Sequence, residues 1–431
     1  MRQTTVRKVQ STERSTRRRA THRLLAIIGV GAIMFAAAPS ARAATPPAFT
    51  AGDLVVYRVG DGSGSEVNTG NAVFLDEYTT TGTLVQSIAM PTSSSGANKA
   101  LIASGTATSE GGLTLSANGS YLTLTGYNAS PGGGTSISGT ASATVSRTVG
   151  VVDWLGDVDT TTSLTDYADT NNPRSAVTTD GSQLWMVGGA GGVRYASRGS
   201  STSTQINSTG TNFRVINIFP DASGNPQLYV SSSSGTPRIA TVGAGVSNAT
   251  GQAITNLAGI SSSNSKSPYS YVFLRLQAGT GGPDTLYVAD DDSTVNGIQK
   301  WSLNSGTWTL KGVIAASSVR GLTGSATAGT ATLYATTGGS GATGGGSIYA
   351  VTDSSGYNAA PPASATTLTL SPAPGTNKAF RGIAFAPSVV GVPVPEGGSP
   401  LVPFVASGFL GLALAAGASV RRRRRATPAL S

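Results

Sequence analysis

Any acid–base, nucleophilic or metal chemistry in this chain has to rely on a restricted set of side chains. The sequence contains no cysteine, and its single histidine, His22, lies close to the N-terminus. Beyond residue 22, these absences exclude thiolate nucleophiles, Ser-His-Asp catalysis and zinc sites built from Cys and His. Chemistry in the rest of the chain would therefore fall chiefly to carboxylates.

Two acidic groups have oxygen ligands of the kind that Ca²⁺ prefers. Asp290, Asp291 and Asp292 are consecutive and follow an apolar segment, while Asp157 and Asp159 alternate like the start of a calcium-binding loop. The second group lacks the glycine that such a loop has at its sixth position. For both groups the alternatives are a Ca²⁺ site and a solvated turn.

Carboxylates could also support an enzyme that acts on carbohydrates. Glycoside hydrolysis needs two acids about 5 to 9.5 Å apart. The available acids include Asp76, Glu77, Asp153 and Asp290. The tryptophans suit either sugar stacking or packing between sheets, and we expect packing; they are Trp154, Trp185, Trp301 and Trp308. A hydrolase or lyase that uses Asp and Glu is thus the alternative to a non-catalytic protein.

The composition favours strands as the elements that would position these groups. The chain has 57 glycines among 431 residues, and only 11% of its residues are charged. Glycine costs roughly 1 kcal/mol per position inside a helix, and disordered segments are usually more highly charged. Many short strands joined by tight polar turns suit this mixture, so an all-β fold is predicted.

A repeated phrase runs through residues 49–388. An apolar strand and a Gly, Asn or Asp turn precede a strand of the form Leu-Tyr/Trp-Val, as in "PQLYVSSSSG" from Pro226 and "DTLYVADDD" from Asp284. The other copies are "DLVVYRVGDG", "SYLTLTGYN", "SQLWMVGGAGG" and "ATLYATTGG". Six copies, each with two further strands, predict a β-propeller of six four-stranded blades. The segment 130–146 is expected to be an inserted loop.

The ends of the repeat predict how the ring closes. The first copy has no partner strand before it, but a matching strand, "KAFRGIAFAPS", occurs at the end of the repeat. Pairing of this strand with the one that begins near Asp53 would close the propeller through its N- and C-terminal strands. The alternatives are seven blades, a tandem of β-sandwiches or a β-helix, although a β-helix would have a shorter period.

The N-terminus has the features of a secretory signal peptide. A basic segment precedes an apolar run of about fifteen residues, and Ala41 and Ala43 then form a small-x-small cleavage pattern before Ala44. A retained membrane anchor is the alternative, but the run is short for a span. We expect residues 1–43 to be removed on export.

The C-terminus combines three features in about 35 residues. The motif Val394-Pro395-Glu396 precedes twenty uncharged residues, 401–420, and a cluster of arginines follows: Arg421, Arg422, Arg423, Arg424 and Arg425. Twenty apolar residues are enough for a membrane helix, and arginines stay on the cytoplasmic side. This layout resembles the PEP-CTERM type of sorting domain found in Gram-negative bacteria that have an exosortase. A plain anchor or a buried core helix are the alternatives.

The resemblance implies a processing route. An exosortase-like membrane enzyme would recognise the C-terminal hydrophobic helix while it crosses the inner membrane, cut near Glu396, and send the body to the cell envelope, outer surface or extracellular matrix. The expected organisation is a signal peptide (1–43), a propeller body (44–388), a linker with the sorting motif (389–400), and a helix with a basic tail (401–431).

The charge distribution bears on partners. The formal net charge is +9, but residues 1–43 contribute +8 and the five closing arginines contribute +5. The body is therefore mildly acidic, and no nucleic-acid partner is predicted. Together, these features predict an exported cell-surface scaffold or binding module, without a cofactor other than Ca²⁺, for a polysaccharide or a surface protein.

Overall fold

The computed structural model describes residues 46–235, 237–279, 281–338 and 344–389. Within these ranges the chain forms antiparallel strands, and the single helical element is a 3-10 turn, η1 (Ile137–Gly139). No helix in the described part is long and apolar enough to cross a membrane. The expected signal peptide, sorting motif, C-terminal helix and arginine cluster lie outside the described residues.

Four sheets contain four strands each. The first two comprise β9 (Pro173–Thr178), β10 (Gln183–Gly188), β11 (Val193–Ser197) and β12 (Thr204–Asn207), and then β13 (Phe213–Pro220), β14 (Pro226–Ser232), β15 (Ile239–Val242) and β16 (Ile254–Asn256). The other two comprise β17 (Pro268–Leu274), β18 (Thr285–Asp290), β19 (Gly297–Asn304) and β20 (Thr307–Ala315), and then β21 (Val319–Thr327), β22 (Thr330–Thr337), β23 (Ile348–Asp353) and β24 (Thr366–Thr367).

A fifth sheet has nine strands and joins the two ends of the body. One part comprises β25 (Ala379–Phe385), β1 (Leu54–Val59), β2 (Asn71–Tyr78) and β3 (Leu84–Ala89). The other part comprises β5 (Thr114–Leu115), β6 (Tyr121–Tyr127), β7 (Arg147–Asp153) and β8 (Val158–Leu164). The short strand β4 (Ile102–Ala103) pairs with both β2 and β6 and so connects the two parts.

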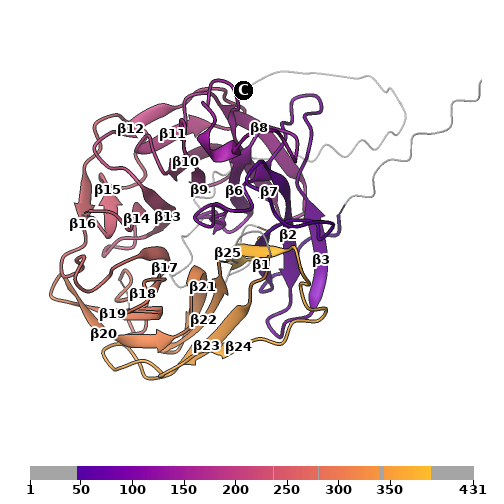
Figure 1. Cartoon of the computed structure of the whole chain (residues 1–431). Coiled ribbons are helices and arrows are strands. Elements are labelled where there is room, and N and C mark those ends of the chain that lie inside the picture. The colour runs from indigo at the N-terminus through magenta and orange to yellow at the C-terminus, as the bar shows by residue number, and fades with distance from the viewer. Residues whose placement is uncertain (1–45, 236, 280, 339–343, 390–431) are drawn as a thin grey trace, which may run out of the picture. The chain divides into compact units, whose positions relative to one another are not determined.

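The sheets follow one another in chain order around the body (Figure 1). One strand of each group contacts its counterpart in the next group: β5 with β9, β9 with β13, β13 with β17, β17 with β21, and β21 with β25, which returns to β5. We call these six the inner strands. Their closed sequence of contacts gives the propeller-like arrangement that the repeat predicts.

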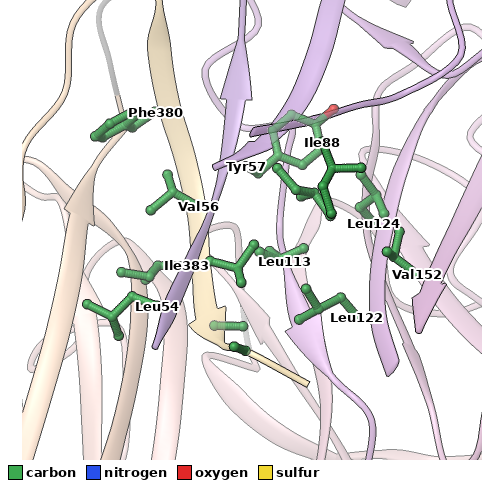
Figure 2. Packing of buried hydrophobic residues seen from close by; sticks show 14 of the residues in the cluster. Leu54, Val56, Tyr57, Ile88, Leu113, Leu122, Leu124, Val152, Phe380 and Ile383 are labelled. Carbon is green, nitrogen blue, oxygen red and sulfur yellow. The ribbon is translucent and has the colours of Figure 1, made fainter. Parts of the chain in front are cut away.

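The predicted pairing of the terminal strands is present. β25 runs antiparallel to β1, with Leu54 opposite Phe385 and Val59 opposite Ala379. Figure 2 shows Leu54 and Val56 beside Ile383, and all of these side chains are almost fully buried. Burial of a large aliphatic side chain contributes roughly 1.5–3 kcal/mol, so this seam belongs to the hydrophobic core.

The repeated phrases form the expected strands because of their turns and their apolar alternation. Gly119 and Gly181 have φ values of 74° and 85° in the tight turns before β6 and β10, a conformation that glycine adopts without strain. The predicted pairs β2–β3 and β19–β20 form as hairpins. The segment 130–146 is a loop with only the η1 turn, as expected.

The tryptophans mostly pack within the protein, as predicted. Trp185, Trp301 and Trp308 are at most 6% exposed, and the ring of Trp308 lies edge-on to Phe273 with the centroids 5.6 Å apart. Trp154 is partly exposed in the turn after β7. The three buried rings are therefore inaccessible to a sugar.

Candidate functional site

The three consecutive acids do not converge on one point. Buried Asp290 accepts hydrogen bonds from the backbone N–H groups of Lys266 and Ser267, at 2.8 and 2.9 Å. Asp291 forms an ion pair with Arg320 at 2.7 Å, whereas Asp292 accepts from Thr294 in an exposed turn. Burial raises the pKa of Asp290. The three carboxylates thus have three separate structural partners.

The second acidic group has similar local roles. Asp159 accepts from both the N–H and the hydroxyl of Thr161 and lies 3.5 Å from Arg198. The N–H of Asp157 donates to Asp153, which closes the turn between β7 and β8. Across the described ranges, no three Asp, Glu, His or Cys side chains are grouped so that they could hold a metal ion.

The acids considered for glycoside hydrolysis are also engaged. Asp76 forms a bidentate ion pair with Arg58, at 2.5 and 3.1 Å. Glu77 is fully buried and accepts from the N–H of Thr50 and the amide of Gln86. With Asp153 in a turn and Asp290 tied to backbone amides, the structure does not bring these four carboxylates into one pocket.

The structure instead assembles a pocket of arginines. Its space is about 300 Å³, including the part open to solvent, and its lining includes Arg214, Arg320, Arg381 and Tyr269. Arg214 is the second residue of β13, Tyr269 the second of β17, Arg320 the second of β21, and Arg381 the third of β25. Because neighbouring inner strands begin on the same side, these side chains meet. We call this pocket the arginine mouth.

Two arginines of the mouth share one aromatic partner. The guanidinium carbons of Arg214 and Arg320 lie 4.7 and 4.8 Å from the ring centroid of Tyr269, which comes from the inner strand between theirs. Such contacts contribute roughly 0.5–1 kcal/mol or more each and fix the orientation of the guanidinium groups. Tyr269 itself is only 7% exposed. The ring therefore serves as a support for the two cations.

Each of these guanidinium groups is held by polar contacts on one side only. Arg214 donates from Nε and Nη2 to Ser233 Oγ, at 2.9 and 2.7 Å. Arg320 donates from Nε to Asp291 and from Nη1 to the carbonyl of Thr108, both within 2.7 Å. Among the described residues, Nη1 of Arg214 and Nη2 of Arg320 have no hydrogen-bond acceptor.

Deeper in the body the positive charge continues. Arg381 is 2% exposed, and burial lowers its pKa to about 10, although Glu110 opposes the shift. Arg174, the second residue of β9, also has a pKa lowered to about 10, by burial first and by Arg214 second. Both guanidinium groups therefore stay protonated at neutral pH and repel their neighbours.

The lining of the mouth also includes one acid, and its pKa is raised. Glu110 lines the mouth, is almost fully buried, and accepts from Tyr127, Asn172 and the N–H of Ser104. Burial raises its pKa despite these contacts. Three arginines line the mouth, whereas its acids are Glu110 and the Asp291 that pairs with Arg320, so cations exceed anions and the mouth has the electrostatics of an anion-binding site.

Glycines allow the arginines to fit. A Cβ at Gly338 would lie 2.5 Å from Cδ of Arg320, and a Cβ at Gly111 would lie 2.7 Å from Cβ of Arg381. Both glycines line the mouth. A side chain at either position would displace the adjacent arginine.

The arginines of the mouth were not among the site residues predicted from the sequence, although the repeat contains their signal. Four of the strands that precede or complete the Leu-Tyr-Val phrase carry arginine near their start: "PRSAV", "FRVIN", "VRGLT" and "FRGIA". Aligning the inner strands by their first residues would have placed these arginines in one layer.

A second pocket lies further along the same inner strands. Its space is about 220 Å³, and its lining includes Leu115, Asn217, Tyr271, Leu322 and Ile383. These positions come from the middle or later part of β5, β13, β17, β21 and β25. The inner strands thus contribute arginines to the first pocket at their beginnings and uncharged side chains to the second pocket further along.

Comparison with known proteins gives structural likeness only. No family model matches the chain, and no curated protein matches it. The solved structures that resemble it include a nidogen/laminin complex, with 12% identity over 78% of this chain and 98% of the other and a TM-score of 0.43. TolB from Acinetobacter baumannii has 10% identity, coverages of 77% and 67%, and a TM-score of 0.42.

A third similar structure is the hydrazine synthase of Kuenenia stuttgartiensis. It is 16% identical over 56% of this chain and 61% of the other, with a TM-score of 0.31. Likeness at this level says nothing about activity, so the function has to be argued from the arginine mouth.

Proposed function

We propose that this protein is an exported, non-catalytic binding module of the cell surface or extracellular matrix, and that it binds an anionic ligand at the arginine mouth. The proposal combines the signal-like N-terminus and sorting-like tail of the sequence with the pocket that the inner strands create. A binding role suits the mouth because its guanidinium groups present positive charge, while the carboxylate of Glu110 is occupied by hydrogen bonds from Tyr127, Asn172 and the N–H of Ser104.

One observation carries the proposal: the mouth lies at one end of the inner strands, and the first and last strands of the described body begin and finish at the other end. Arg381 is near the start of β25, whereas the start of β1 lies opposite the end of β25, with Leu54 paired to Phe385. Beyond β25, Ser388 exchanges hydrogen bonds with the turn at Gly119 and Ser120, at the far end of β5. The body could thus be attached at one face while it binds at the other.

The sorting route is part of the proposal. Val394, Pro395 and Glu396 would be recognised by an exosortase-like enzyme, with 401–420 crossing the inner membrane transiently and Arg421–Arg425 held on its cytoplasmic side. The mature protein would begin at Ala44 and end near Glu396.

The number of blades is also part of the proposal. We divide the nine-stranded sheet at β4 into two four-stranded blades, β25-β1-β2-β3 and β5-β6-β7-β8. With the four separate sheets this gives six blades, each with one inner strand. The short β4 then acts as a bridge between the first two blades.

Two measurements test the function. The full chain, expressed in a Gram-negative host that has an exosortase, should be recovered outside the inner membrane with an intact mass that lacks residues 1–43 and the arginine cluster. Recovery of Arg421–Arg425 in the inner-membrane fraction would instead identify a permanent anchor. Independently, the purified protein should bind polyanions more tightly than neutral dextran, and equal binding to both would refute the anion-binding role.

A further inference from the structure

We propose that the ligand of the arginine mouth is a carboxylate group of an acidic, uronic-acid type polysaccharide. This inference rests on the proposed function and specifies its ligand. It starts from the number of cationic donors that the fold leaves available at the mouth.

The available donors match a group with two charged oxygens. Arg214 and Arg320 each retain one terminal nitrogen, Nη1 and Nη2 respectively, without an acceptor among the described residues. Both side chains line the same pocket and are oriented by the same Tyr269 ring. The two nitrogens can each donate to one oxygen of the same carboxylate, which matches the paired, charge-assisted geometry that arginine forms with carboxylates.

The shape and rim of the mouth favour a sugar as the carrier. The most buried cation of the pocket, Arg381, is 2% exposed, so the pocket suits a single charged group at the end of a ligand better than a broad charged surface. Hydroxyl side chains of Thr108, Ser109 and Ser270 also line it. They can exchange hydrogen bonds with the hydroxyl groups next to the carboxylate on a uronic acid ring.

The test uses the full chain and isothermal titration calorimetry with oligogalacturonate as the probe. The comparison ligands are dextran sulfate, inorganic phosphate, poly-glutamate and neutral dextran. Arg214→Gln removes one donor and should weaken oligogalacturonate binding at least about tenfold, because a charge-assisted hydrogen bond is lost. Arg198→Gln is the matched control, since Arg198 is exposed on another part of the body and pairs with Asp159; its affinity should be unchanged.

A second variant keeps the positive charge of Arg320 but displaces its side chain. Gly338→Ala places a methyl group against Arg320 and should also weaken binding, while Gly64→Ala, with open space around its Cβ position, should not. Circular dichroism of each variant verifies that it is folded.

The outcomes separate the two proposals. Tighter binding of dextran sulfate or phosphate than of oligogalacturonate, lost in Arg214→Gln, would overturn the carboxylate inference and leave the anion-binding function standing. Binding of poly-glutamate as tight as that of oligogalacturonate at equal carboxylate concentration would overturn the sugar part. If no anion binds, both proposals fail.

Discussion

Leu54 and Phe385 lie opposite each other across two antiparallel strands, although they come from the two ends of the described body. Their strands, β1 and β25, form a seam of buried aliphatic and aromatic side chains that includes Val56, Phe380 and Ile383. Every inner strand therefore has a neighbour on both sides, and the stability of the ring depends on this seam.

Ile383→Ala should destabilise the whole body. Ile383 is 2% exposed, and truncation of a buried isoleucine typically costs 2–5 kcal/mol. Urea unfolding followed by tryptophan fluorescence would measure the change. Val389→Ala, at a side chain that is 41% exposed, is the control and should stay within about 0.5 kcal/mol of wild type.

Deleting 378–388 extends the same test, because it removes β25 and exposes both β1 and β21. Cooperative unfolding should then be lost. Wild-type stability in the deletion variant would show that the seam does not close the ring.

Lys300→Met should cost about 3–5 kcal/mol, because it leaves a buried carboxylate without its cation. Lys300 Nζ lies 2.8 Å from Asp353, and both side chains are fully buried. Asp353 also accepts from Tyr287, so three strands, β18, β19 and β23, meet at this group. Chemical denaturation would measure the loss.

Lys311→Met, at a half-buried lysine on β20, is the matched control and should have a small effect. The double variant Lys300→Met/Asp353→Leu should lose less stability than the sum of the single variants, because the orphaned charge is gone. Strictly additive losses would contradict the ion-pair explanation.

Asp53 should make the protein less stable at neutral pH than in mild acid. Burial, helped by the charge of Glu77, raises the pKa of Asp53 from 3.8 to about 6. When the pKa of a carboxyl group is higher in the folded state than in the unfolded state, the group contributes stability that is fully present below the unfolded-state pKa. That stability is lost as the pH rises through the folded-state pKa, here about 6. Melting temperatures at pH 4.5 and pH 7 would therefore differ less in Asp53→Asn than in wild type.

Asp61→Asn is the control for that experiment. Hydrogen bonds from Ser63 lower the pKa of Asp61, so its stabilising contribution is already present at pH 4.5 and does not change up to pH 7. The difference between the two melting temperatures should then equal that of wild type. An unchanged difference in Asp53→Asn would rule out Asp53 as a source of the pH dependence.

The repeat in the sequence was enough to predict the strands. Alternating apolar residues and turns such as those at Gly119 and Gly181 act over a few residues, so β1, β6, β10, β14, β18 and β22 could be recognised as copies of one phrase. The closing strand "KAFRGIAFAPS" was found by the same likeness, and its pairing with β1 followed from the missing partner. The sorting motif Val394-Pro395-Glu396 stays a prediction.

The site depended on contacts that no local pattern contains. Asp290, Asp291 and Asp292 are adjacent in sequence, yet in the folded chain they have different partners, so their spacing alone does not indicate a shared site. Arg214, Arg320 and Arg381 are far apart in the chain and meet only because the inner strands start on one side of a closed ring. The sequence by itself determined the strands, because apolar alternation and turn residues act between near neighbours in the chain. Only the tertiary structure determined the arginine mouth, because the charge at a pocket depends on which distant residues the packing brings together.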